Sequence, residues 1–276
     1  MPVRSHRYCW SKLKNWLNDG AFAAVNELLT LQSTNCLARL VNFAQLITMS
    51  SPLPPIINAE ISPNYIRQLV GADARVILDI GAHHGWHTAA FEKMFSDAII
   101  YAFEPDPRAI AKFSANINSA RVRLFKVAIG AVDGKAEFHV SSGLPPDIDP
   151  VSAAIVYPLG WDQSGSLRAP KRHKEKWPWC TFESTTTVAV RALDSWATDN
   201  AIEKIDFIWA DMQGAEGDLL TGGQNTLART RYLYLEYSNE EIYEGEPTLQ
   251  MLLDMLPNYS IVIRYPGDVL LKNMHL

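Results

Sequence analysis

The stretch "VILDIGAHHGWHT", residues 76–88, decides the fold. Its first five residues are an apolar run of the length of a buried strand, and the residues after Thr88 continue with helical spacing. Gly81 and Gly85 bracket the turn between the two. Glycine lets a ligand approach the backbone, and the start of a helix offers unpaired amides. The stretch therefore predicts a strand, a tight turn and a helix that form one side of a binding site.

The same alternation of strand and helix continues along the chain. Helical segments are indicated near 107–118, 215–228 and 248–256. Short apolar runs lie at 98–104, 122–129, 205–211, 232–237 and 259–265. Strands that are apolar on both faces and alternate with helices form a mostly parallel sheet. We therefore predict an α/β fold with a doubly wound, mostly parallel sheet.

The N-terminal part of the chain stands apart from this alternation. Residues 1–50 have the spacing of two amphipathic helices, and "SSPLPP" (50–55) ends them because proline lacks a backbone donor. We predict an N-terminal helical extension, a cap, over 1–58 and a main domain over 59–276. The apolar stripes of the extension could form a homodimer interface, since they need something to cover them.

The middle of the main domain departs from the pattern as well. Residues 134–142 alternate apolar and polar side chains, which predicts an edge strand or a hairpin arm. Residues 141–187 lack periodicity and are too long for a simple connection. We expect this segment, called the insertion below, to form a lid or a binding loop.

Composition limits the classes of partner and compartment. The chain has 276 residues and a net charge of −5, so no basic surplus points to nucleic acid as the partner. Its apolar runs are shorter than the ~18 residues of a transmembrane helix. Three widely spaced cysteines form no disulfide framework, which favours a reducing compartment such as the cytoplasm.

Two acids and the glycine turn indicate the ligand. Asp79 closes the first strand, and Glu104 ends the second strand in "YAFEPDP". An acid at that place can accept both hydroxyls of a ribose, which favours an adenosine-type ligand. The glycine spacing is GxxxG, whereas a pyrophosphate site needs GxGxxG. An NAD-type oxidoreductase is therefore disfavoured, and a plain strand–turn–helix with incidental acids remains an alternative.

Several segments together resemble one family. The segments "VILDIGAHHGWHT", "YAFEPDP", "VAIG", "RALDSWA", "IDFIWADMQGAEGDLLTGG" and "YLYLEYS" stand in the order seen in FkbM-type S-adenosylmethionine-dependent O-methyltransferases. The resemblance covers residues 75–240 and excludes 1–60 and the insertion. It implies a class I methyltransferase sheet of seven strands with the last one antiparallel. S-adenosylmethionine, which leaves as S-adenosylhomocysteine, would lie across the ends of strands one to four.

The resemblance also implies positions for the donor. Asp79, Gly81 and Gly85 match the glycine-rich donor loop, Glu104 matches the ribose acid, and Ala128 lies where the third strand ends near the adenine. The donor site expected from these matches comprises Asp79, Gly81, Ala82, His83, Gly85, Thr88, Glu104, Pro105, Asp106, Ala128 and Asp211. His83 departs from the family, in which an asparagine is common at this place.

Candidates for catalysis lie after the fourth and fifth strands. Asp211 and Glu236 match acidic positions of the family there, and His83 is the third candidate. A positioned carboxylate or histidine that accepts the hydroxyl proton can contribute ~10²–10⁴-fold. Asp211 could instead only fix its loop. For Glu216, we favour a role in complementing the helix dipole.

The acceptor side is expected to use aromatic residues of the insertion. Aromatic faces pack on the apolar side of sugar rings. The expected substrate-binding residues are Trp161, Trp177, Trp179, Gln213 and Tyr237; Gln213 replaces the commoner glutamate of the family. The basic cluster "RAPKRHKEKWPW" (168–179) could bind phosphate or acidic sugars, or could be a solvated charged face.

The histidines raise the question of a metal. His83 and His87, or His84 and His87, have spacings that can place two ligands on one helix face. Gly85 interrupts them at the helix start, and no neighbouring Glu-x-x-His or cysteine completes a set. We expect no divalent metal.

The resemblance, together with these patterns, implies O-methyl transfer to a hydroxyl of a sugar, glycan or related small molecule. A non-catalytic glycan- or partner-binding module on the same fold is the alternative that stays open besides the oxidoreductase.

Overall fold

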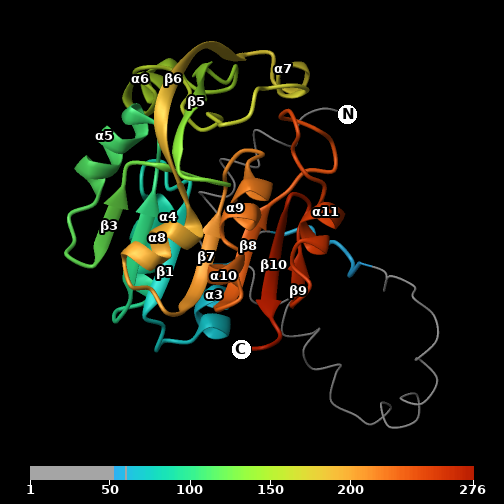
Figure 1. The fold of residues 1–276 in the computed structure, drawn as a ribbon. Helices are drawn as coiled ribbons and strands as arrows, with labels where there is room; N and C mark the ends of the chain where they lie inside the picture. The colour runs from blue at the N-terminus through green and yellow to red at the C-terminus, as the bar shows by residue number, and fades with distance from the viewer. Residues whose placement is uncertain (1–52, 60) are drawn as a thin grey trace.

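The computed structural model describes residues 53–59 and 61–276. A seven-stranded sheet runs through the main domain (Figure 1). Its strands, in spatial order, are β3 (Val122–Phe125), β2 (Ile99–Phe103), β1 (Val76–Ile80), β7 (Ile205–Ala210), β8 (Thr230–Glu236), β10 (Asp268–Asn273) and β9 (Tyr259–Arg264). Only β10 runs antiparallel to its neighbours. The prediction of a doubly wound, mostly parallel sheet with the last strand antiparallel is confirmed. The predicted helices of 1–50 and their dimer interface lie outside the described residues.

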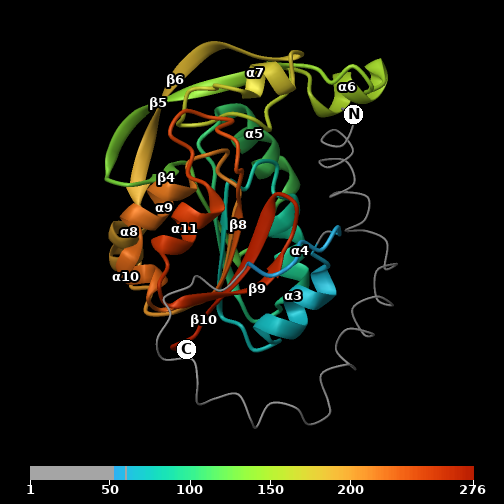
Figure 2. The same ribbon diagram turned by 90° about the vertical axis from the view of Figure 1, so that its right-hand side faces the viewer.

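Helices cover both faces of this sheet (Figure 2). On one face lie α3 (Pro63–Val70), α4 (Trp86–Met94) and α5 (Pro107–Asn116). On the other lie α8 (Leu193–Asp199), α9 (Glu216–Gly222), α10 (Gln224–Leu227) and α11 (Leu249–Asp254). The segment predicted as one helix over 215–228 is thus two helices that meet at Gly223.

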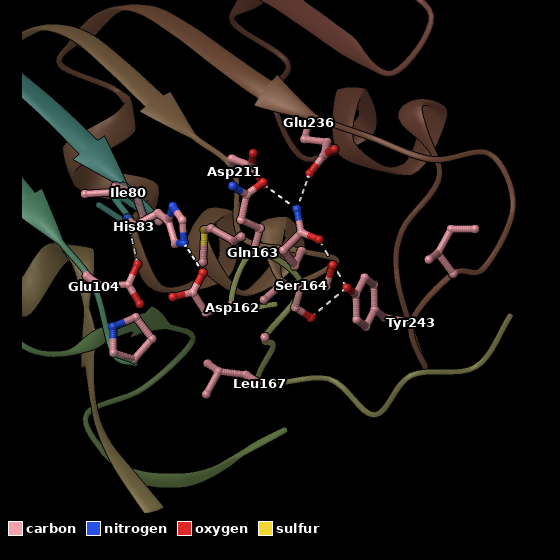
Figure 3. A pocket seen from close by; sticks show the side chains of 18 of the residues that line it. Ile80, His83, Glu104, Asp162, Gln163, Ser164, Leu167, Asp211, Glu236 and Tyr243 are labelled. Atoms are coloured by element: carbon pink, nitrogen blue, oxygen red, sulfur yellow. Dashed lines mark hydrogen bonds and ion pairs between the residues drawn. The ribbon is translucent and has the colours of Figure 1, made fainter. Parts of the chain in front are cut away.

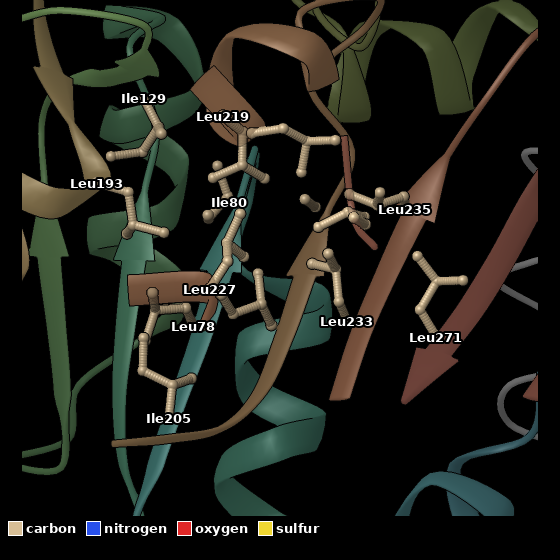
Figure 4. Close-up of a cluster of buried hydrophobic side chains, with 14 of the residues drawn as sticks. Leu78, Ile80, Ile129, Leu193, Ile205, Leu219, Leu227, Leu233, Leu235 and Leu271 are labelled. Atoms are coloured by element: carbon tan, nitrogen blue, oxygen red, sulfur yellow. The ribbon is translucent and has the colours of Figure 1, made fainter. Parts of the chain in front are cut away.

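The core explains why the strands read as continuous apolar runs. Leu78 and Ile80 of β1 point to the α8–α11 face, whereas Ile77 points to the α3–α4 face. The larger core cluster contains Leu78 and Ile80 together with Leu233 and Leu235 of β8 (Figure 4). Because helices cover both faces of each parallel strand, the residues that point to either face are mostly apolar.

A second sheet lies above the carboxyl ends of the first (Figure 1). It consists of β4 (Ala128–Gly130), β6 (Cys180–Ala192) and β5 (Gly134–Gly143) in that order. The strand predicted at 134–142 is confirmed as β5. The strand predicted at 122–129 is wrong as one unit, since β3 ends at Phe125 and Ala128 begins β4 beside β6. The apolar run crosses both strands, so the sequence gives no signal for the break.

The insertion contains more regular structure than expected. It holds α6 (Pro150–Val156) and α7 (His173–Lys176), and its last eight residues are the first part of β6, antiparallel to β5. The strand lacks apolar alternation there because Ser184, Thr185 and Thr187 are solvent-exposed. β-branched threonine still favours a strand. No helix in the described part of the chain has the length and hydropathy to cross a membrane.

Candidate active site

A cavity of about 980 Å³ lies at the carboxyl ends of β1, β2, β7 and β8, beneath the insertion. Figure 3 shows His83, Glu104 and Asp162 on one side of it and Asp211, Glu236 and Tyr243 on the other. Of the predicted residues, those that line it are Gly81, Ala82, His83, Glu104, Pro105, Ala128, Trp161, Trp177, Trp179, Asp211, Gln213, Glu236 and Tyr237. The topology thus gathers both predicted groups around one space.

Two parts of this lining are named for the strands that carry them. The β1–β2 wall consists of Gly81, Ala82, His83, Glu104 and Pro105, which follow β1 and β2. The β7–β8 wall consists of Asp211, Gln213, Glu236 and Tyr237, which follow or end β7 and β8.

Gly81 lets the two walls approach each other. Its φ is +81°, and a Cβ atom built on it would lie 1.9 Å from the carbonyl oxygen of Asp211. The backbone N–H of Asp211 donates to the carbonyl of Ile80 at 3.0 Å. Because the Cβ atom would overlap a main-chain oxygen, no side-chain rearrangement can make room for a larger residue.

Four predicted donor residues lie behind the cavity rather than on its surface. They are Asp79, Gly85, Thr88 and Asp106. The Thr88 hydroxyl donates to Asp79 Oδ2 at 2.5 Å, and Asp79 Oδ1 has no hydrogen-bond partner. Burial raises the pKa of Asp79 to about 7. Asp106 caps α5 by accepting the Arg108 N–H and also forms an ion pair with the Arg108 guanidinium at 2.6 Å. These residues fix the shape of the β1–β2 wall.

Glu104 is the buried acid of the β1–β2 wall. It accepts the backbone N–H of His83 at its Oε2 and that of Asp106 at its Oε1, each at 2.8 Å. Burial, with smaller contributions from Asp106 and Asp162, raises the pKa of Glu104 to about 8. A carboxylate held in this way faces the cavity with lone pairs that ligand hydroxyls can use.

A hydrogen-bond network fixes the β7–β8 wall. The side-chain amide of Gln213 donates to Asp211 Oδ1 at 2.6 Å and to Glu236 Oε2 at 2.9 Å. Its carbonyl oxygen accepts from the Tyr243 hydroxyl at 3.1 Å, which also donates to the carbonyl of Ser164 at 2.9 Å. Gln213 is thus a bridge between two acids, a role that its sequence position did not reveal.

Asp162 is a site residue that sequence reasoning missed. Its Oδ1 lies 2.7 Å from His83 Nε2 and its Oδ2 lies 2.9 Å from His84 Nε2, and the two imidazole rings stack at 3.5 Å. His87 instead packs on the Trp209 ring, so the histidine pairings considered from the sequence do not form. Nothing in the aperiodic sequence of the insertion singles out Asp162.

This cluster has three groups that could ligate a metal. The two imidazole rings stack with an interplanar angle of 20°. Each ring nitrogen Nε2 lies within hydrogen-bond distance of a different carboxylate oxygen of Asp162, so both oxygens have an imidazole partner. The geometry therefore favours a hydrogen-bonded cluster, called the clamp below, in which Asp162 holds His83 and His84.

The insertion contributes an aromatic surface and a set of ion pairs. Trp161 packs edge-to-face on Trp179 at 5.2 Å and lies 4.9 Å from the ring of Tyr157. In the basic cluster, Lys176 and Arg172 pair with Glu240, at 2.7 and 3.2 Å. Lys171 pairs with Glu241. These ion pairs fasten the insertion to the loop after β8.

Glu216 supports the β7–β8 wall from behind. It is buried at the start of α9 and accepts the backbone N–H of Met212 at 2.9 Å. Burial raises the pKa of Glu216 to about 8. Glu216 lies in the first turn of the helix, as the predicted role in complementing the helix dipole requires, but with this pKa it is uncharged near pH 7 and acts as a hydrogen-bond acceptor for Met212.

Comparisons with known proteins agree with the geometry. Residues 79–261 match the Methyltransferase FkbM domain. The chain is 42% identical over 206 residues to the 2-O-methyltransferase NoeI of Sinorhizobium fredii (strain NBRC 101917 / NGR234), a match that spans 73% of this chain and 80% of that protein.

Two solved structures are similar at low sequence identity. Aeropyrum pernix fibrillarin in complex with S-adenosyl-L-methionine is 14% identical, with a TM-score of 0.37, over 74% of this chain and 68% of that chain. The precorrin-6y C5,15-methyltransferase of Geobacter metallireducens GS-15 is 10% identical, with a TM-score of 0.38, over 78% and 91%. With scores this low, the strand order is the evidence for the fold.

Proposed function

The chain belongs to the FkbM methyltransferase family, and from this premise we propose that it methylates a ring hydroxyl of a sugar or glycan, in the 2-O position. The chain is an S-adenosylmethionine-dependent O-methyltransferase. The observation that carries the proposed acceptor is one cavity that joins a buried acid, a pair of bridged carboxylates and an aromatic surface.

The β1–β2 wall would hold the donor. Glu104 is buried, faces the cavity and is fixed by two backbone amides, so its free lone pairs suit the two hydroxyls of a ribose. Gly81 and Ala82 bring the backbone to the cavity surface without a large side chain. When bound, S-adenosylmethionine supplies an electrophilic methyl group on a sulfonium centre. That the reaction uses no divalent metal stays a prediction.

The β7–β8 wall would hold the acceptor hydroxyl. Asp211 and Glu236 both accept from the side-chain amide of Gln213, which fixes their orientation. We assign Asp211 to accept the proton of the acceptor hydroxyl. We assign Glu236 to orient this hydroxyl. Positioning of two reactants in line can contribute ~7–11 kcal/mol. His83 is the weaker base candidate because its Nε2 is bound to Asp162.

The insertion would select the sugar and exclude water. Trp161, Trp177 and Trp179 line the cavity and offer faces for the apolar side of a sugar ring. The described basic residues Lys171, Arg172 and Lys176 form ion pairs with three acids, Glu175, Glu240 and Glu241. A neutral sugar therefore fits better than a phosphorylated one. The spacing of the cysteines supports a cytoplasmic location.

Calorimetric titration tests the donor site first. The protein is titrated with S-adenosylmethionine, S-adenosylhomocysteine and NAD, and the titration is repeated with Glu104→Ala. Glu203→Ala, which removes an exposed glutamate in the loop before β7, is the matched control. We expect micromolar binding of both sulfur nucleosides by the wild type and the control, and its loss in Glu104→Ala. Binding that Glu104→Ala leaves intact would contradict the assigned donor site.

A screen with labelled methyl groups tests the acceptor. We expect transfer to a neutral glycan, and Asp211→Asn should lower turnover without changing donor affinity. Full turnover by Asp211→Asn would remove the base role. Donor binding without transfer to any sugar would favour the non-catalytic binding module.

A further inference from the structure

Asp162 connects the insertion to the donor loop. It lies between α6 and α7, is 5% exposed, and reaches across to the histidines that follow β1. The Nζ of Lys112, on α5, lies 3.3 Å from its Oδ2. A residue of the insertion thus contacts groups from two elements of the main domain.

Asp162 acts in this cluster as a charged acceptor. Although burial alone raises the pKa of Asp162, the hydrogen bonds from His83 and His84 hold that pKa well below its usual range. Burial lowers the pKa of His84, which is therefore a neutral donor to Asp162 near neutral pH. Hydrogen bonds to an ionised acceptor are about twice as strong as neutral ones.

The clamp continues from His83 to Glu104. His83 has a φ of +48°, a left-handed conformation that is uncommon for residues other than glycine and asparagine. In this conformation its backbone N–H donates to Glu104 Oε2 at 2.8 Å. Asp162 holds the side chain of the same residue at 2.7 Å. Such a backbone conformation persists only when the surrounding structure enforces it.

From this chain of contacts we propose that Asp162 is a positioning residue for donor binding. Asp162 fixes His83, and His83 fixes both the donor loop and the carboxylate of Glu104. The insertion is then part of the donor site as well as the cover of the acceptor site. The inference rests on the proposed position of the donor at Glu104.

Donor affinity provides the test, because it requires no acceptor. S-adenosylhomocysteine is titrated into wild type, Asp162→Asn and Asp218→Asn. Asp218 is the matched control, since its ion pair with Arg168 at 2.5 Å also fastens the insertion, but to α9. We expect Asp162→Asn to weaken binding about tenfold, the loss of one charge-assisted hydrogen bond, and Asp218→Asn to change it less than about twofold.

A double-mutant cycle shows whether Asp162 acts through His83. Asparagine tolerates the left-handed conformation, so His83→Asn keeps the loop backbone without the clamp. Asp162→Asn should then have almost no further effect on the affinity of His83→Asn. Amide hydrogen exchange of residues 81–85 should rise in Asp162→Asn and stay unchanged in Asp218→Asn.

The outcomes separate the two ideas. A wild type that binds no S-adenosylhomocysteine contradicts the proposed function. A wild type that binds it, with equal affinity in Asp162→Asn and unchanged exchange at 81–85, overturns the inference alone. If Asp162→Asn does not fold, His83→Ala removes the same contact from the other side. Undiminished donor affinity in that folded variant also overturns the inference.

Discussion

The two walls of the cavity are held by different kinds of contact. In the β1–β2 wall, Glu104 is fixed by backbone amides two and twenty-one residues away, and Gly81 packs directly on a carbonyl. In the β7–β8 wall, a side-chain amide bridges two acids and a tyrosine. That tyrosine is tied to a carbonyl of the insertion, 79 residues away in sequence. Backbone groups take part in these contacts of the first wall, in addition to the side-chain contact from Asp162 to His83, whereas the second wall is bridged by side chains. The difference suits a common donor and a variable acceptor.

The substitution Gly81→Ala has the largest expected effect, and it tests whether the backbone fixes the β1–β2 wall. The new Cβ would overlap the Asp211 carbonyl oxygen at 1.9 Å, and the residue would be held at positive φ. We expect a loss of about 3 kcal/mol in the free energy of unfolding and at least about 100-fold in donor affinity. Urea unfolding and titration with S-adenosylhomocysteine measure the two effects.

Gly217→Ala is the control for that variant. Gly217 lies within α9, and the atoms nearest to a Cβ there would be those of the Pro247 ring, the first at 3.2 Å, without any overlap with the main chain among them. Its stability and donor affinity should stay within about 1 kcal/mol of the wild type, because alanine favours the helix. If both variants behave alike, the β1–β2 wall is not fixed by its backbone.

Gln213→Leu probes the side-chain bridge. It keeps a side chain of similar size and removes the amide donor to Asp211 and Glu236. We expect kcat to fall about 10- to 100-fold, with the acceptor found by the screen, because the two acids lose the group that fixes their orientation. Donor affinity should change little. A variant that loses donor affinity and keeps kcat would reverse the roles of the two walls.

Burial raises the pKa of an acid near each wall, Glu104 and Glu216. The variant Glu216→Gln measures how this shift changes the free energy of unfolding with pH. The pKa of Glu216 is about 8 in the folded protein, against about 4.3 in an unfolded chain. The folded state therefore retains a proton between these values, and stability falls as pH rises from about 5 to 8. Gln keeps the acceptor for Met212 N–H but cannot ionise.

Urea unfolding at several pH values checks this sign. The variant should lose less stability than the wild type across the window, by up to about 1.4 kcal/mol per pH unit. Glu104 and Asp79 still contribute a slope of the same sign. Equal slopes in the two proteins would show that Glu216 is ionised in the fold.

The smallest expected effect is that of Trp177→Ala. Trp177 lines the cavity from the insertion and contacts the ring of His173 at 4.6 Å. Loss of one stacking surface should raise the acceptor KM about threefold to tenfold. Donor affinity, measured by titration, should not change. A change in donor affinity instead would place the donor, and not the sugar, against this ring.

The sequence predicts the β1–β2 wall better than the contacts of the β7–β8 wall and of the insertion. Gly81 and Glu104 stand at the ends of apolar strands, and strand ends gather at one edge of a parallel sheet. The role of Asp162 could not be predicted, because it depends on how the insertion folds and the insertion has no apolar periodicity. The bridge made by Gln213 depends on the approach of β7, β8 and the loop of Tyr243. The division of 122–129 into β3 and β4 had no signal because both pieces are apolar.

The β5–β6 ribbon makes the insertion an exchangeable unit. Gly143 and Cys180 are paired at the end of the ribbon, so the segment 144–179 leaves and returns at neighbouring points. Gly143 has a φ of +88°, and a Cβ there would lie 1.9 Å from the Trp179 carbonyl, so the base of the segment is closed. Segments of other lengths can be grafted between these ends at small entropic cost. Recombination at this one point could give the same methyl donor a new sugar, provided that the incoming segment still presents a carboxylate to His83.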